Sequence, residues 1–257
     1  GYQDQQEGDN ISEEKMKPIY RRFILKLSGE ALQGKVGYGI GSEALISISR
    51  EIKDVRDMGC EIGIVLGGGN IFRGNSRDKN VIDRVNADYM GMLATVINGL
   101  ALQNTLEKMG LETRVQSAFD MKQFCEPYIR RRAIRHLEKK RVVIFVGGTG
   151  NPYFTTDTAA ALKAVEIGAE AVLKATKVDG VYSSDPMLNP AAERYNRLTY
   201  IEVLQKRLKI MDSAAISLCM ENRIPVIVFN LFEKGNLTKI ATGNGRCTIL
   251  SDTADAG

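Results

Sequence analysis

The sequence holds a single histidine, His136, and its four cysteines, Cys60, Cys125, Cys219 and Cys247, stand far apart. No two cysteines form a CxxC pair, and no group of histidines could complete a zinc site. In a chain of 257 residues, free thiols in a reducing compartment explain these cysteines better than a disulfide framework does. The shortage of histidine and paired cysteine therefore argues against a structural metal centre.

Long apolar runs are also missing. No stretch approaches the roughly 18 apolar residues of a membrane-spanning helix, and the N-terminus has no apolar signal core. The 35 basic and 31 acidic residues leave a net charge of +4, which is too balanced to indicate a membrane or nucleic-acid partner. We therefore expect a soluble cytoplasmic protein that requires neither.

Two common phosphate-binding motifs are absent as well. The sequence contains neither the GxxxxGK[ST] loop nor the GxGxxG fingerprint. Glycine is nevertheless dense at 67–69 and 147–150, directly after two apolar runs. Glycine lets backbone N–H groups approach an anion closely, although one such cluster is more often only a tight turn. Two clusters at neighbouring strand ends predict room for two phosphorylated ligands.

The apolar pattern alternates between short β-branched runs and longer segments of helical spacing. We expect strands at 23–27, 62–66, 113–118, 141–146, 171–174, 226–229 and 247–250. We expect helices at 45–58, 90–109, 126–137, 158–167 and 213–221. This order predicts an α/β fold with a mostly parallel central sheet and helices on both faces, and ligands at the carboxyl ends of the strands. Residues 1–17 are predicted to be a flexible tail and 18–257 a single domain.

Two cations are placed where phosphates would need them. Lys26 lies at the end of an apolar strand, where an ammonium group is costly unless it meets an anion. Arg73 follows the triple glycine and suits bidentate phosphate contact. A structural salt bridge for Lys26 and a solvated surface position for Arg73 stay open. Phosphoryl transfer to a phosphate oxygen needs no general base, so such cations could suffice.

Two acidic loops, 155–157 and 178–186, complete the set of candidate polar groups. Both contain turn-forming or helix-capping residues and could be plain connections. The functional alternative is a nucleotide pocket in which Tyr182 packs on a base and Asp185 accepts a hydrogen bond from a ribose.

Five segments, 26–30, 67–74, 88–95, 148–157 and 173–182, resemble the bacterial UMP kinases of the amino acid kinase family. The lysine and triple glycine are shared across that family, whereas the runs TGNPYFTTD and KATKVDGVY are typical of UMP kinases. The resemblance spans about 20–250 and implies the amino acid kinase fold, a three-layer αβα sandwich. It also implies an acceptor part at roughly 18–160 and an ATP-binding part at roughly 161–257.

The resemblance implies roles for individual residues. Lys26 and Arg73 would be catalytic, and Asp157 and Asp212 would orient the cations and the water near Mg²⁺. ATP would be bound by Lys26, Leu27, Ser28, Gly29, Gly69, Arg73, Thr176, Tyr182 and Asp185. UMP would be bound by Gly68, Asp88, Thr149, Gly150, Asn151, Pro152, Tyr153, Phe154, Thr155 and Thr156.

The resemblance further implies Mg²⁺ carried mainly by nucleotide phosphates and water, a homohexamer, and inhibition by UTP. Activation by GTP would act through the loop Gly34, Lys35, Val36, Gly37, Tyr38 and Gly39. The charged stretch 76–83 departs from the family pattern, which is rich in glycine and alanine there. Two other functions stay open: a kinase for a carboxylate or carbamate, and a non-catalytic nucleotide sensor or oxyanion store.

Overall fold

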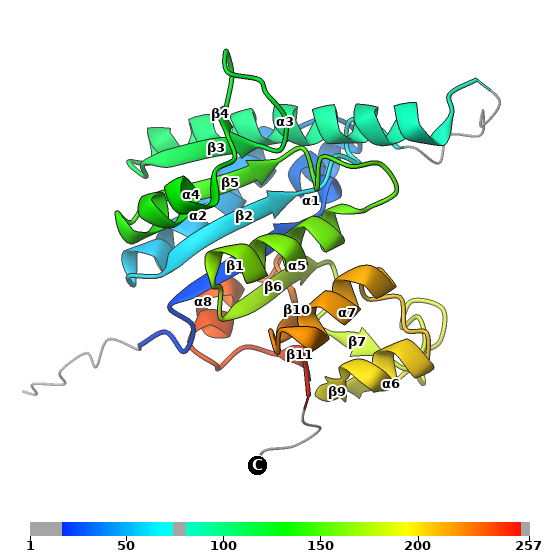
Figure 1. Ribbon diagram of the computed structural model, residues 1–257. Coiled ribbons are helices and arrows are strands. Elements are labelled where there is room, and N and C mark those ends of the chain that lie inside the picture. Colours follow the sequence, from blue (N-terminus) through cyan, green and yellow to red (C-terminus); the bar gives the residue numbers. More distant parts are fainter. Residues whose placement is uncertain (1–16, 74–80, 253–257) are drawn as a thin grey trace, which may run out of the picture.

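The protein is described by a computed structural model that covers residues 17–73 and 81–252, so most of the predicted tail and of the stretch 76–83 lie outside the described residues. Its central sheet has nine strands in the order β4-β3-β5-β2-β1-β6-β10-β11-β9 (Figure 1). The strands are β1 Arg22–Leu27, β2 Glu61–Leu66, β3 Thr113–Ser117, β4 Glu126–Pro127, β5 Val142–Val146, β6 Ala171–Thr176, β9 Arg197–Thr199, β10 Val226–Asn230 and β11 Cys247–Ser251.

Pairing within this sheet is parallel throughout, apart from β10 with β11. A separate antiparallel pair joins β7, Val181–Tyr182, to β8, Arg194–Tyr195. All six residues of β2 are buried, as expected for a parallel strand that is covered on both faces. The predicted mostly parallel sheet is confirmed.

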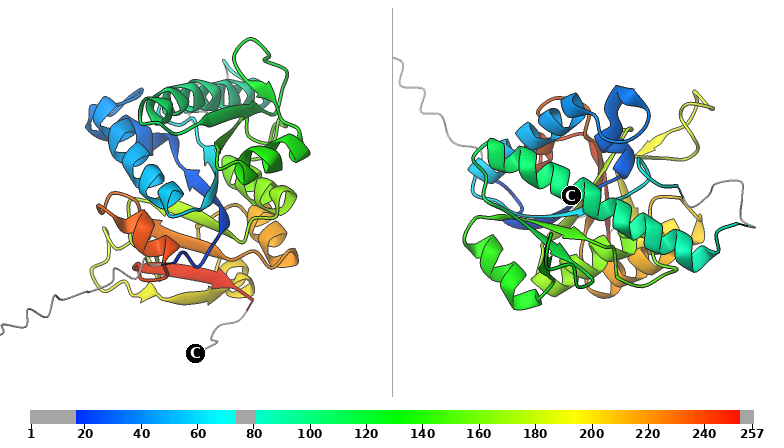
Figure 2. Two further views of the ribbon diagram at one scale, coloured as in Figure 1. Left: turned by 90° about the vertical axis from the view of Figure 1, so that its left-hand side faces the viewer. Right: turned by 90° about the horizontal axis from the view of Figure 1, so that it is seen from above.

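Helices cover both faces, as predicted (Figure 2). One face packs against α1 Gly29–Gln33, α2 Ser42–Asp57, α3 Arg84–Lys108 and α8 Asn236–Ala241. The other face packs against α4 Arg130–Glu138, α5 Thr156–Ile167, α6 Tyr200–Gln205 and α7 Ser213–Glu221. Alternation along β1 divides the core, because Phe23 and Leu25 join the first cluster and Ile24 joins the second. Lys26 is two residues beyond Ile24, so its side chain lies on the same face of the sheet as Ile24, the face that α5 covers.

Side-chain caps fix where several helices begin. Asp83 accepts a hydrogen bond from the Asn86 N–H at 2.9 Å and starts α3, six residues earlier than the apolar pattern predicted. Thr199 forms a capping box with Glu202 at the start of α6. Thr155 and Asp212 cap α5 and α7, and both caps lie beside Lys26 and its partners.

The predicted helix 126–137 is wrong at its start. Glu126 and Pro127 form β4, which pairs with the end of β3, and α4 begins only at Arg130. Proline lacks an N–H, so Pro127 suits a short edge strand. The short elements α1, α6, α8, β7, β8 and β9 were not predicted. Among the described residues, no helix is long and apolar enough to cross a membrane.

Candidate active site

The loops that follow β1 and β2 are in close contact. The Gly67 N–H donates to the Leu27 carbonyl oxygen at 2.8 Å. A Cβ on Gly29 would lie 2.4 Å from Oδ1 of Asn70 and 2.6 Å from the Gly69 nitrogen. Asn70 is itself held by Asn98 of α3, since each side chain donates to the other at 2.8 to 2.9 Å. Glycine is therefore required here for the packing of two backbones.

Lys26, Asp157 and Lys174 form a cluster on the face of the sheet that α5 covers. Lys26 and Lys174 are direct neighbours on β1 and β6. Nζ of Lys26 lies 3.0 Å from Oδ1 of Asp157, and Nζ of Lys174 lies 2.9 Å from Oδ2. Lys174 also donates to the Ile210 carbonyl oxygen. Two ammonium groups and one carboxylate leave the cluster with one net positive charge.

Burial and charge act in opposite directions on the pKa of these groups. Burial by itself raises the pKa of the Asp157 carboxyl, but the ammonium groups of Lys26 and Lys174 outweigh it and hold that pKa below its usual range. Burial lowers the pKa of the Lys174 ammonium, and Asp157 offsets part of that effect. Oδ1 of Asp157 receives no well-directed hydrogen bond from the described residues, so its contact with Lys26 is an ion pair alone.

Asp212 ties the start of α7 to the start of α5. Its Oδ1 accepts from the Ala215 N–H at 2.8 Å, and its Oδ2 accepts from Thr158 Oγ1 at 2.8 Å and from Thr155 Oγ1. Because Asp157 lies in the first turn of α5, this brace fixes the backbone that carries it. Asp157 thus contacts Lys26 directly, Asp212 acts on it only through α5, and the predicted role of both near bound nucleotides stays a prediction.

Arg73 is the second predicted cation, and it lies at the surface with 63% of its side chain exposed. Its Nε donates to the Gly69 carbonyl oxygen at 3.1 Å, and its Nη2 lies 2.6 Å from Oε1 of Glu30. Arg73 lines a cavity of about 630 Å³ together with Gly69, Asp88 and Thr155.

Most of the predicted acceptor residues surround an adjoining cavity of about 200 Å³. Its lining from that set is Gly68, Asp88, Thr149, Phe154, Thr155 and Thr156. Asp88 accepts from the Tyr153 N–H at 2.7 Å and contacts Arg84 Nε at 2.9 Å. The Asp88 carboxylate thereby joins α3 to the loop after β5.

Four predicted acceptor residues do not line that cavity, namely Gly150, Asn151, Pro152 and Tyr153. They belong to the same loop, which the Thr149 hydroxyl stabilises by accepting from the Asn151 N–H at 3.1 Å. Tyr153 adopts a φ of 72°, a left-handed conformation that is uncommon outside glycine, and Arg84 lies over its ring. Its hydrogen bond to Asp88 stabilises this turn.

The predicted donor residues Thr176, Tyr182 and Asp185 line a second large cavity, of about 630 Å³, at the ends of β6 and β10. The Tyr182 hydroxyl donates to Asp179 at 2.6 Å, and Asp185 accepts from the Met187 N–H at 2.9 Å. Lys174 lines the same cavity, as do Lys206, Arg207 and Lys209, none of which was predicted. Leu27, in contrast, is fully buried, so only its backbone can serve a ligand.

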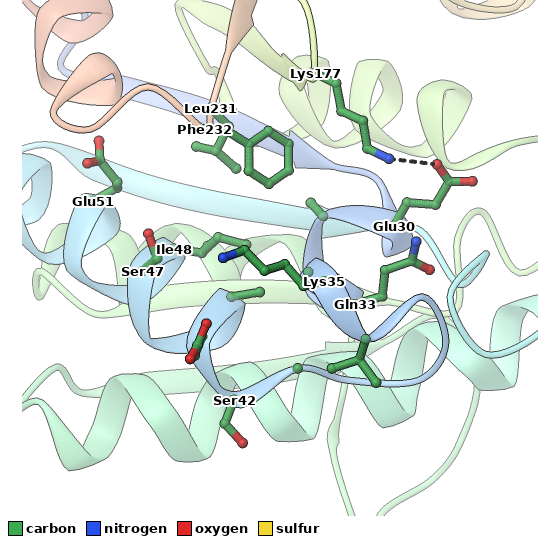
Figure 3. Close-up of a pocket in the computed structure, with 16 residues that line it drawn as sticks. Glu30, Gln33, Lys35, Ser42, Ser47, Ile48, Glu51, Lys177, Leu231 and Phe232 are labelled. Carbon is green, nitrogen blue, oxygen red and sulfur yellow. Dashed lines mark ion pairs between the residues drawn. The ribbon is translucent and has the colours of Figure 1, made fainter.

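The loop predicted to bind GTP borders a third cavity, of about 700 Å³, on the side of α1 and α2 (Figure 3). Gly34, Lys35 and Val36 line it, whereas Gly37, Tyr38 and Gly39 do not. Leu231 and Phe232 close the opposite wall, and Glu30 and Lys177 face each other across its edge.

Sheet order places Lys26 between the cavity that predicted acceptor residues line and the cavity that predicted donor residues line. The first of these is built on loops after β2 and β5, and the second on β6, β10 and the loops beyond them. β1 lies between β2 and β6. No group of three or more acidic, histidine or cysteine side chains among the described residues could hold a metal ion.

Known proteins share most of this chain's length and its fold. The pattern of the Amino acid kinase family matches residues 21–230. The chain is similar to the UMP kinase from Bacillus anthracis, with 41% identity, a TM-score of 0.88, and coverage of 91% of this chain and 97% of that chain. It is similar to the UMP kinase from Ureaplasma parvum at 38% identity and a TM-score of 0.85, over 90% and 98% of the two chains. A uridylate kinase from Archaeoglobus fulgidus matches at 25% identity and a TM-score of 0.68, over 89% and 99%. This chain therefore belongs to the amino acid kinase family.

Proposed function

We propose that this protein is a UMP kinase, which transfers the γ-phosphoryl group of ATP to UMP and yields UDP and ADP for pyrimidine nucleotide synthesis. The observation that carries the proposal is the buried Lys26–Asp157–Lys174 cluster, whose two lysines lie on neighbouring strands between two cavities at the carboxyl edge of the sheet. Its net positive charge suits the phosphates of two nucleotides that meet there. The two UMP kinases at 38% and 41% identity support the choice of UMP as acceptor.

We assign the cavity at 174–210 to the nucleoside of ATP and the cavity beside α3 to UMP. Thr176, Tyr182 and Asp185 hold the donor nucleoside, while Lys26 to Gly29, Gly69 and Arg73 contact its phosphates. Asp88 and the loop 149–156, with Gly68, hold UMP. The acceptor part then lies at roughly 18–160 and the ATP part at roughly 161–257, with β1 serving both.

The reaction is a direct in-line displacement. An oxygen of the UMP phosphate attacks the γ-phosphorus, the bond from that phosphorus to the β–γ bridging oxygen breaks, and ADP leaves with the electron pair. The attacking oxygen is already ionised at neutral pH, so no residue has to remove a proton. Lys26 and Arg73 stabilise the charge on the transferred group, Asp157 fixes the Lys26 ammonium, and Asp212 fixes the start of the helix that carries Asp157.

Mg²⁺ is assigned to the nucleotide phosphates. The described residues offer no cluster of three ligating side chains, and Asp157 is already occupied by two ammonium groups. An ion held mainly by phosphate oxygens and water fits that donor set. When bound, Mg²⁺ neutralises phosphate charge and orients the phosphate chain.

We also propose a homohexamer in the cytoplasm that UTP inhibits and GTP activates through the loop 34–39. An exposed apolar stripe on α3 supports self-association: Tyr89, Met90, Leu93 and Ile97 are 39% to 50% exposed. All four cysteines are free, which agrees with a reducing compartment.

An acceptor panel tests the proposed function. ADP release should be measured with ATP and Mg²⁺ over UMP, CMP, AMP, glutamate, aspartate and carbamate. UMP should give turnover far above every other acceptor. A higher turnover with a carboxylate or with carbamate than with UMP would favour another kinase activity of the family. No turnover with any acceptor would favour a non-catalytic nucleotide sensor or oxyanion store.

Two substitutions test the assigned cations. Lys26→Ala and Arg73→Ala should each lower kcat about a hundredfold or more, because each removes charge that stabilises the transition state. Lys53→Ala and Arg50→Ala, which truncate partly or fully exposed side chains of α2, are matched controls and should keep wild-type rates. Near-normal turnover in both site variants would refute the assignment.

A further inference from the structure

Glu30 lies in the first turn of α1, between the two loops assigned to acceptor and donor. Its Oε1 is 2.6 Å from Nη2 of Arg73, which belongs to the loop after β2. Its Oε2 is 3.8 Å from Nζ of Lys177, which follows β6 (Figure 3). One carboxylate therefore contacts a cation on each side of β1.

The contact with Glu30 leaves several donors of the Arg73 guanidinium without a partner among residues 17–73 and 81–252. The group has five N–H donors, and Arg73 uses Nε for the Gly69 carbonyl oxygen and Nη2 for Glu30. Two anchors on one edge fix the plane of the group, and the remaining donors at Nη1 and Nη2 suit two oxygens of a phosphate. Without Glu30, the bond to the Gly69 carbonyl oxygen is the one remaining hydrogen bond of the side chain to the described residues.

The side chains of Arg73 and Glu30 are 63% and 40% exposed, so burial does not hold either of them in position. An exposed pair contributes little to the stability of a fold. Its effect therefore lies in orienting Arg73, and removal of Glu30 should change the reaction far more than the stability.

We propose that Glu30 is a positioning residue for phosphoryl transfer, which orients the Arg73 guanidinium towards the transferred group and links the loop of Arg73 to that of Lys177. This inference rests on the proposed function. Glu30 lines the same cavity as Arg73, and in this proposal it acts through Arg73 and not as a ligand of the substrates. A misplaced catalytic group costs about tenfold to a hundredfold in rate, so loss of Glu30 should act chiefly on kcat.

A double-mutant cycle with UMP as acceptor tests the proposal. Glu30→Ala should lower kcat about tenfold or more, change KM for UMP less than threefold, and leave Tm within a few degrees of wild type. In an Arg73→Ala background the same change should have less than a twofold effect, because its target is gone. Glu30→Gln, which keeps an oxygen acceptor, should recover part of the lost rate. Glu43→Ala, in the first turn of α2, is the matched control and should match wild type.

If Glu30→Ala lowers kcat by the same factor in the wild type and in the Arg73→Ala background, or leaves kcat unchanged, the positioning role of Glu30 is overturned. The proposed function still stands in either case. If the wild type fails to phosphorylate UMP, the proposed function fails, and Arg73 is then followed by NMR of its Nε–H. That signal should exchange slowly with water in the wild type and in Glu43→Ala, and faster in Glu30→Ala. The same exchange rate in all three would again overturn the positioning role.

Discussion

The Asp157 carboxylate is placed between two ammonium groups, Lys26 at 3.0 Å and Lys174 at 2.9 Å. Replacement by Asn would leave two cations side by side in a mostly buried position. Breaking a buried ion pair costs about 3–5 kcal/mol, so we expect Asp157→Asn to lower the free energy of unfolding at pH 7 by about 3 kcal/mol. Denaturant unfolding measures the loss, with the exposed Asp54→Asn as the matched control.

The stabilities of the wild type and Asp157→Asn can also be compared as a function of pH. The pKa of Asp157 is lower in the folded state than its ordinary value, so the stability that its charge contributes is fully present above the unfolded pKa. It is lost as the pH falls through the folded pKa. The stability gap between wild type and Asp157→Asn should therefore be constant from about pH 5 to 7 and shrink below about pH 4. A gap that grows on acidification would contradict the assignment.

The buried cysteine thiols give a further prediction about single residues. Burial raises the pKa of Cys60 to about 11 and that of Cys219 to about 12, so neither forms a thiolate near neutral pH. In the native protein at pH 8, Cys60 and Cys219 should stay unmodified by Ellman's reagent, whereas guanidinium should release four thiols per chain. Cys247, which is only partly buried, should react first, and Cys247→Ser should remove that phase. Rapid labelling of all four would show that the described core opens readily.

The surroundings of some single residues could be predicted from the sequence, and those of others could not. An anionic partner for Lys26 could be predicted, because an ammonium at the end of an apolar strand needs an anion, and the structure supplies Asp157. This ion pair is the structural alternative left open by the sequence, and the catalytic role of Lys26 stays a prediction. Lys174 ends a predicted strand in the same way, so that argument could have found it. Glu30 could not have been found, because its contact with Arg73 depends on how two loops meet across 43 residues of sequence.

The contact between the loop after β1 and the loop after β2 sets the shape of the predicted phosphate cradle. Gly29→Ala would place a Cβ within 2.6 Å of the Gly69 backbone nitrogen, so one loop must shift. We expect a loss of about 1–3 kcal/mol in stability, as for other overpacked sites. Gly69→Ala is the control, since a Cβ there meets nothing within 4 Å, and its unfolding curve should match wild type. Equal stability of both variants would show that the loops are not in tight contact.

Long elements were predicted better than short ones. Every predicted strand exists, because most of them are runs of apolar, often β-branched residues that are buried on both faces, and β11 alternates between buried and partly buried residues. The two-residue strands β4, β7 and β8 have no pattern of their own and exist only through their partners. The predicted helix 126–137 was wrong at its start for that reason, since pairing with β3 decides the state of Glu126 and Pro127.

At the scale of the molecule, the strand order explains why segments far apart in sequence share one site. β1 lies between β2 and β6, so Lys26 has Val65 on one side and Lys174 on the other, and it pairs with Asp157 of α5. Alternation of strands and helices predicted the sheet and its two covered faces. It could not predict this order, because parallel pairing depends on contacts between distant segments.

The exposed stripe on α3 gives a prediction about assembly. Leu93 and Ile97 are 49% and 50% exposed on a helix whose opposite side packs on the core. Replacing both by Lys should disrupt contacts between copies and lower the mass measured by sedimentation velocity. Ile46→Lys, on exposed α2 surface, is the control and should keep the wild-type mass. An unchanged mass in the double variant would exclude α3 as the interface.

The central claim is that Lys26 lies where the phosphates of two nucleotides meet. A crystal structure with UMP and a non-hydrolysable ATP analogue tests it most directly. The account predicts UMP beside α3, the analogue in the cavity at 174–210, and the Lys26 ammonium within about 3 Å of a phosphate oxygen. A Lys26 ammonium that stays paired only with Asp157, far from both phosphate chains, would contradict it.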